Sequence, residues 1–134
     1  MAKIEFLNLG KQPITNNFLN NPKPKSEFFY DLKITFDDKS KIVSLANFVP
    51  PEKMFNETYA HRASMSKTMQ ISNYELSNYI KKRFGPKSIL EIGSNDGIFL
   101  KNFNNILRIG VEPCNNLALI TNEMGIKTYP NFYY

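Results

Sequence analysis

The sequence predicts an α/β protein in which a small β-rich amino-terminal module precedes a unit of parallel strands alternating with helices. Two observations predict this class. The first 50 residues form short extended segments separated by turns. Beyond residue 85, apolar strands alternate with segments of helical spacing, which is typical of a parallel sheet. We therefore expect three parts, at residues 1–50, 51–85 and 86–134.

Hydrophobic content, net charge and the numbers of cysteines and histidines exclude several classes of protein. The chain has 134 residues, of which 42% are hydrophobic, enough for a real core. No apolar run approaches the roughly 20 residues that span a bilayer, and the amino terminus lacks a secretory signal, so we expect a cytoplasmic protein and no membrane contact. The net charge of +5 comes mainly from scattered lysines, so we expect no nucleic-acid partner. One cysteine and one histidine allow neither a disulfide nor a zinc cluster.

The amino-terminal module is expected to be a small antiparallel layer. A strand is predicted at residues 4–7, and side chains alternate over residues 28–36. Residues 37–40 have turn composition, and residues 41–45 then form the returning strand. The Asn- and Pro-rich stretch at 20–24 is predicted to be a loop. Such a layer buries little area alone, so it should pack against something else.

A helix is predicted between residues 65 and 84, where apolar side chains recur at helical spacing. It could start near Met65, or at the capping box of residues 72–75. Gly85 and Pro86 end it. Five further elements are expected after it: strand 88–92, helix 98–103, strand 108–113, helix 117–124 and a third strand starting near 126.

The loop between the first of these strands and its helix carries the chemistry. Gly93 and Gly97 allow the backbone to turn sharply and to approach a ligand closely. Glu112 ends the next strand, at the spacing where an acidic residue commonly accepts hydrogen bonds from a ribose diol. The glycine spacing departs from the strict dinucleotide pattern, which favours a ligand without a pyrophosphate. A tight turn in a ligand-free α/β protein stays an alternative.

Given these residues, the chain resembles the sugar C-methyltransferase family, whose members methylate nucleotide-linked deoxysugars using S-adenosylmethionine. The resemblance runs collinearly through nearly the whole chain. The shared segments are LGKQPITNNFL at 9–19, VPPEKMF at 49–55, SMSKTM at 64–69, EIGSNDG at 91–97, and GVEP at 110–113 with Asn116.

The resemblance implies a partial Rossmann-like methyltransferase unit that binds S-adenosylmethionine. The cofactor-binding residues that it implies are Glu91, Gly93, Ser94, Asn95, Gly97 and, for the ribose, Glu112. It implies a small-molecule acceptor, such as a nucleotide-linked sugar. It assigns no catalytic residue, although Tyr59 and His61 stand where the family usually has two tyrosines and are candidates for acid–base work.

The chain departs from the family in two further respects. Family members have an amino-terminal zinc module built from paired cysteines, whereas this chain has Asp37 and Ser40 where the second pair should stand, so we expect no zinc. The family also continues beyond residue 134, which predicts a truncated fold with an exposed apolar edge at residues 89–92. We therefore expect a homo-oligomer or a complementing chain, and no autonomous catalysis. The alternative is a non-catalytic remnant that serves as a binding or protein-interaction module.

Overall fold

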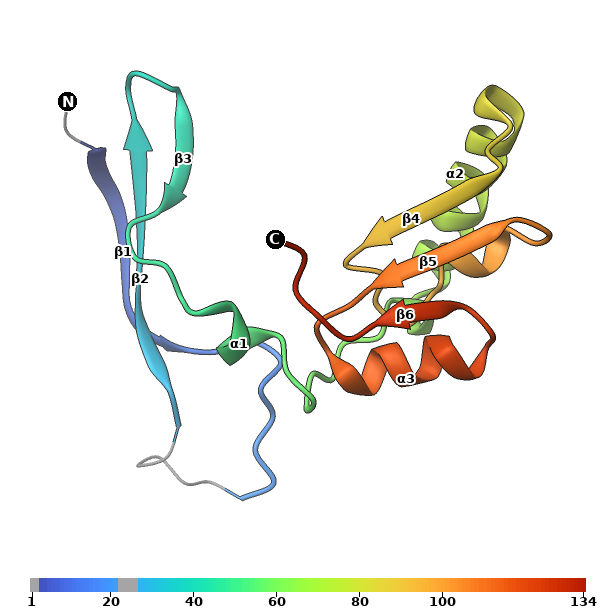
Figure 1. The fold of residues 1–134 in the computed structure, drawn as a ribbon. Coiled ribbons are helices and arrows are strands. Elements are labelled where there is room, and N and C mark those ends of the chain that lie inside the picture. Colours follow the sequence, from blue (N-terminus) through green and yellow to red (C-terminus); the bar gives the residue numbers. More distant parts are fainter. Residues whose placement is uncertain (1–2, 22–26) are drawn as a thin grey trace. The chain divides into compact units, whose positions relative to one another are not determined.

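The computed structural model describes residues 3–21 and 27–134, and the chain divides into two compact units, Met1–Met54 and Phe55–Tyr134 (Figure 1). Most of the loop predicted at 20–24 lies outside the described residues. None of the helices in the described part of the chain is long and apolar enough to cross a membrane. The protein is α/β, with an antiparallel sheet in the first unit and a parallel sheet with helices in the second.

The first unit is a three-stranded antiparallel sheet in the order β1-β2-β3. Its elements are β1 (Lys3–Pro13), β2 (Phe29–Asp37), β3 (Ile42–Leu45) and the short helix α1 (Pro51–Met54). β1 is longer than the strand predicted at 4–7, because the ladder continues through register shifts between Glu5 and Leu7 and between Asn8 and Lys11. Gly10 takes φ 67° within the second shift, which a glycine does at little cost.

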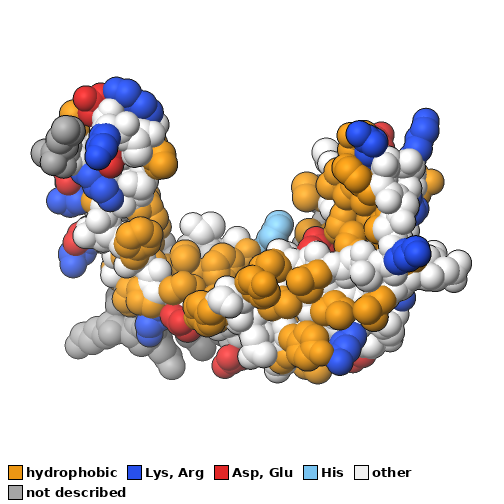
Figure 2. Space-filling view, turned by 45° about the horizontal axis from the view of Figure 1, so that its top comes forward, with side chains coloured by type: hydrophobic (Ala, Val, Ile, Leu, Met, Phe, Trp, Pro, Cys, Tyr) orange, Lys and Arg blue, Asp and Glu red, His pale blue; other side chains and the backbone are white. Residues whose placement is uncertain are grey.

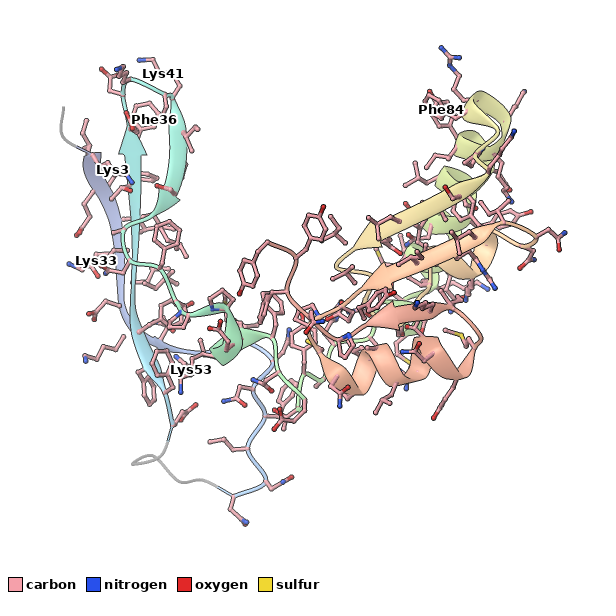
Figure 3. The ribbon with its side chains drawn as sticks, in the orientation of Figure 1. Lys3, Lys33, Phe36, Lys41, Lys53 and Phe84 are labelled. Carbon is pink, nitrogen blue, oxygen red and sulfur yellow. The ribbon has the colours of Figure 1, made fainter. Side chains whose placement is uncertain are left out.

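The first unit buries few side chains. Ile14, Thr35 and Val49 are its buried residues among those described. At the β2–β3 turn the Nζ of Lys41 lies 6.0 Å from the ring centroid of Phe36 (Figure 3). Apolar side chains on β1 remain exposed, including Phe6 at 57%, so the first unit buries little apolar area.

The second unit contains three parallel strands in the order β4-β5-β6 (Figure 1). Its strands are β4 (Ser88–Ile92), β5 (Leu107–Val111) and β6 (Lys127–Tyr129), and its helical segments are η1 (Ala63–Met65), α2 (Lys67–Phe84), η2 (Leu100–Asn102) and α3 (Asn115–Glu123). The predicted alternation of strands and helical segments is therefore present. Parallel strands need crossover connections, and η2 and α3 lie in them.

One face of the parallel sheet carries the core. The buried cluster consists of Phe99, Leu100, Phe103 and Ile126, with Ile80, Ile89 and Ile106 packed against it. The other face is largely open, since Leu90, Ile92 and Leu107 are all more than half exposed. Figure 2 shows hydrophobic side chains gathered on the molecular surface. β4 is an edge strand of this sheet.

The structure differs from the predicted helix at 98–103 and decides between the two predicted starts of α2. The predicted α-helix at 98–103 is wrong, because the segment forms only the single 3₁₀ turn η2. The side-chain amide of Asn102 donates to the carbonyls of Ile98 and Phe99 at 3.1 and 3.2 Å, which closes the turn locally. α2 starts at Lys67 with Ser66 as its N-cap, so the earlier of the two predicted starts is closer, and Gly85 caps its end with φ 53°.

Candidate functional site

The loop after β4 folds back over the end of β5. The N–H groups of Gly93 and Ser94 both donate to the carbonyl oxygen of Val111, at 2.8 and 3.2 Å. Gly93, Asn95 and Gly97 have positive φ angles of 73°, 49° and 75°. Asparagine is among the few residues other than glycine that adopt this region readily. The loop thus lies at the carboxyl ends of two parallel strands, where open α/β sheets bind ligands.

The two loop glycines serve different purposes. A Cβ placed on Gly93 would meet nothing within 4 Å, so the backbone there is open to an approaching molecule. A Cβ on Gly97 would lie 2.9 Å from Cγ2 of Thr121, so Gly97 allows the loop to pack closely on α3. Gly93 therefore leaves room for a ligand, and Gly97 allows the loop to pack against α3.

Glu112 holds the loop through its carboxylate. The side chain is only 5% exposed. Its Oε2 accepts a hydrogen bond from the N–H of Asn95 at 2.8 Å, and its Oε1 accepts one from the N–H of Cys114 at 2.9 Å. Each carboxylate oxygen can accept a further hydrogen bond. Glu112 therefore joins the glycine loop to the start of α3 and keeps acceptor capacity for a diol.

Cys114, the single cysteine, is fully buried next to this carboxylate. Burial, and then the hydrogen bond with Glu112, raise the pKa of its thiol to about 12. The thiol is therefore protonated at neutral pH and unreactive, which agrees with a structural rather than a chemical role.

A row of polar groups crosses the sheet beneath the loop. Glu91 pairs in register with Gly110, which pairs with Thr128 on β6. A Cβ on Gly110 would lie 2.6 Å from Oγ of Ser94 and 2.7 Å from Oγ1 of Thr128, so both hydroxyl oxygens stand close to the Gly110 backbone. A side chain at Gly110 would collide with Ser94 and Thr128, so the absence of one allows the 93–97 loop to pack on the sheet.

Three buried oxygen atoms in this region lack a hydrogen-bond partner among the described residues. They are Glu91 Oε2, Ser94 Oγ and Asn116 Oδ1. Burial, and then repulsion from the carboxylate of Glu112, raise the pKa of Glu91 to about 8. Unsatisfied buried polar groups are costly and call for an explanation. A ligand that brings hydrogen-bond donors and positive charge would satisfy them.

The structure brings His61 to the same loop and Tyr59 to the start of α3. The side-chain amide of Asn116 donates to the carbonyl oxygen of Tyr59 at 2.9 Å, and that of Asn95 donates to the carbonyl of His61 at 3.3 Å. The rings of Tyr59 and His61 meet edge-on with centroids 6.3 Å apart. Tyr59 is half-buried and His61 is exposed.

Sequence reasoning did not assign a role to Asp96, which the structure places at the centre of this region. Asp96 is 2% exposed, and both its carboxylate oxygens lie 3.3 Å from the N–H of Ser64. The Nε of Arg62 forms an ion pair with it at 3.5 Å. An acidic residue inside a glycine loop was the available signal, but its partner Ser64 lies 32 residues away in the sequence.

The first unit does not offer the donors of a structural zinc site. The single cysteine and the single histidine, Cys114 and His61, both lie in the second unit. At the position expected for a cysteine pair, Oδ1 of Asp37 instead accepts hydrogen bonds from the N–H groups of Lys39 and Ser40, at 2.9 and 3.3 Å. These bonds hold the pKa of Asp37 below its usual value. Over residues 3–21 and 27–134, no group of three or more potential ligands could hold a metal ion.

Two comparisons with known proteins show what the chain is similar to. A family model described as "Putative zinc binding domain" matches residues 1–55. The C-methyltransferase NovU of Streptomyces niveus is 24% identical over 133 residues, which is 95% of this chain and 31% of NovU. The chain thus spans about a third of the length of that relative. Together the two matches confirm the resemblance expected from the sequence: over nearly its whole length the chain is similar to the sugar C-methyltransferase family.

Proposed function

We propose that this chain is the S-adenosylmethionine-binding part of a methyltransferase that acts on a small-molecule acceptor such as a nucleotide-linked sugar. The observation that carries the proposal is the pair of buried acceptors without partners among the described residues, Glu91 Oε2 and Ser94 Oγ, at a glycine loop that Glu112 closes. The similarity to a C-methyltransferase supports the same reading.

The strand order supports a Rossmann-like unit. Three parallel strands follow each other in the sheet as they do in the chain, with helical segments in both crossovers. Ligands of such folds bind outside the carboxyl ends of the strands, where the 93–97 loop and Glu112 lie. This placement supports the proposal that the loop and Glu112 bind a nucleotide-like ligand.

The residues present match the chemistry of the cofactor. S-adenosylmethionine carries an ammonium group, a sulfonium and a ribose diol, and when bound it supplies an activated methyl group. Glu91 would face the positive charge, which would favour its ionised form. Glu112 would accept hydrogen bonds from the diol, since a carboxylate only accepts. Gly93 would let the loop backbone come close to the ligand.

The acceptor must lose a proton from the carbon that receives the methyl group. His61 and Tyr59 are the candidates for this step in the described residues, because the carbonyl of His61 accepts a hydrogen bond from Asn95 of the 93–97 loop and that of Tyr59 accepts one from Asn116 of α3. A histidine is suited to general-base work near neutral pH. We further propose that a second copy or a complementing chain pairs with the edge strand β4 and covers the open face of the sheet, where Leu90 and Ile92 are 51% and 56% exposed.

A second candidate is a non-catalytic interaction module. The exposed apolar side chains on β1 and β4 favour it, since large exposed apolar patches mark interaction sites. The missing zinc donors of the first unit favour it as well. Both candidates predict a folded chain, but they differ in whether that chain binds the cofactor.

Calorimetric titration with S-adenosylmethionine separates the two. We expect the wild-type chain to bind, and Glu112→Ala to lose binding because the loop loses its carboxylate. Glu123→Ala serves as a matched control, since Glu123 is an exposed glutamate in the last turn of α3. Thermal unfolding by circular dichroism establishes that each variant is folded. No heat of binding with the folded wild-type chain would refute the cofactor proposal and favour the interaction module.

A further inference from the structure

Residues 59–64, here called the 59–64 segment, lie mostly outside regular secondary structure yet are held at several points. Its backbone makes hydrogen bonds to three side chains that lie more than 30 residues further along the chain. The contacts are Tyr59 O with Asn116 Nδ2 (2.9 Å), His61 O with Asn95 Nδ2 (3.3 Å), Ala63 N with Asn95 Oδ1 (2.8 Å) and Ser64 N with the Asp96 carboxylate (3.3 Å). Two of these side chains, those of Asn95 and Asp96, belong to the 93–97 loop.

Asn95 uses all four of its polar groups, and each meets a different residue. Both polar atoms of its side-chain amide bind the 59–64 segment: Nδ2 donates to the carbonyl of His61, and Oδ1 accepts from the N–H of Ala63. Its backbone N–H donates to Glu112 at 2.8 Å, and its carbonyl accepts from Oγ1 of Thr121 at 3.3 Å. One residue thus connects the 59–64 segment, the carboxylate at the end of β5, and α3.

The turn itself does not require the amide side chain. Asn95 has φ 49°, which an asparagine tolerates and a glycine tolerates better. A glycine would therefore keep the backbone course of the loop and lose only the two bonds to the segment. This separates the role of the side chain from that of the backbone.

We propose that Asn95, helped by Asp96, is a positioning residue that holds the 59–64 segment on the 93–97 loop and so keeps Tyr59 and His61 next to the cofactor site. The position of these two side chains then depends on the loop that binds the cofactor. The effect on the cofactor site rests on the proposed function. The mechanical link, by which we mean the attachment of the 59–64 segment to the 93–97 loop, rests on the hydrogen bonds alone.

Limited trypsin digestion of the full chain, with cleavage sites resolved by mass spectrometry, tests the link. Cleavage after Arg62 requires the segment to open, because the next N–H is bound to Asn95. Losing two hydrogen bonds should raise the cleavage rate at Arg62 about tenfold in Asn95→Gly. Cleavage at Lys127, in β6, reports opening of the sheet and should not change. Equal rates at Arg62 in the variant and the wild type would overturn the proposal.

Asn105→Gly is the matched control. Asn105 also has a positive φ, 68°, in the same unit, and it is exposed and away from the 59–64 segment in sequence. We expect it to leave cleavage at Arg62 unchanged. If Asn105→Gly raises that cleavage as much as Asn95→Gly does, the effect is a general loosening and the proposal is wrong.

The imidazole of His61 provides a readout that loss of stability alone would not move. It is the only histidine, so the Hε1 proton of its ring gives one NMR signal in the folded chain. S-adenosylhomocysteine, at concentrations that saturate each protein, should shift that signal in the wild type and leave it nearly unchanged in Asn95→Gly. If both proteins bind and show the same shift, Asn95 does not position His61. If neither protein binds, the proposed function fails, and the trypsin result still decides the mechanical link.

Discussion

The carboxyl group of Glu91 lies where a negative charge is costly. Burial, and then repulsion from Glu112, raise its pKa to about 8 from an ordinary value of 4.5. Between these two pH values the folded chain therefore holds a proton that the unfolded chain releases. The free energy of unfolding then falls as the pH rises from 4.5 to 8, and it is unaffected by this group below 4.5.

Glu91→Gln should remove this penalty, because glutamine resembles the protonated acid. We expect the variant to unfold with a free energy about 2–4 kcal/mol higher than the wild type at pH 8.5, and no higher at pH 4.5. Urea unfolding at both pH values measures the difference. Glu123→Gln, at an exposed glutamate, should match the wild type at both. A Glu91→Gln effect of the same size at both pH values would show that the carboxyl is not held protonated.

At the scale of single elements, the absence of a side chain at Gly110 allows β5 to pack closely against the 93–97 loop and β6. A side chain there would overlap Ser94 and Thr128, so the 93–97 loop and β6 would both have to move. We expect Gly110→Ala to destabilise the second unit by about 1–3 kcal/mol, the usual range for overpacking. Thermal unfolding followed by circular dichroism measures it.

Gly85→Ala separates overpacking from backbone strain. Gly85 has φ 53°, but a Cβ there would meet nothing within 4 Å. Its replacement should cost only about 1 kcal/mol, from the left-handed backbone. A smaller loss of stability for Gly110→Ala than for Gly85→Ala would contradict the close packing described around Gly110.

Some elements could be predicted because local chemistry alone specifies them. The end of α2 follows from Gly85 and Pro86, and the β2–β3 turn from the ability of Asp37 to accept backbone hydrogen bonds. The helix predicted at 98–103 failed because Ile98, Phe99 and Phe103 have helical spacing but reach the core from a tight turn. Periodicity cannot distinguish these two ways of burying the same side chains.

The candidate site was predictable only in part, for a similar reason. The loop glycines and Glu112 follow from strand order and spacing. The contacts of Asn95 and Asp96 with the 59–64 segment do not, because they join residues 32 apart with no periodic pattern between them. The three-part division of the chain and the roles of the site residues stay predictions.

For the whole molecule, the first unit should be independent of metal. Its sequence contains neither cysteine nor histidine, and the hydrogen bonds of Asp37 close the turn where the family's cysteines would stand. We expect thermal unfolding of the full chain to be the same with and without a chelator such as EDTA, and added Zn²⁺ to leave it unchanged. A lower unfolding temperature after chelation would show that a metal does contribute to the fold.

The most direct test of the cofactor site is a site-resolved one. Two-dimensional ¹⁵N–¹H NMR spectra of the full chain, recorded during titration with S-adenosylhomocysteine, report each backbone amide separately. We predict that the largest shifts fall on residues 93–97 and on Cys114, whose N–H donates to Glu112. Shifts confined to the first unit or to the exposed end of α2, or no shifts in a folded chain, would contradict the assignment of this loop as the cofactor site.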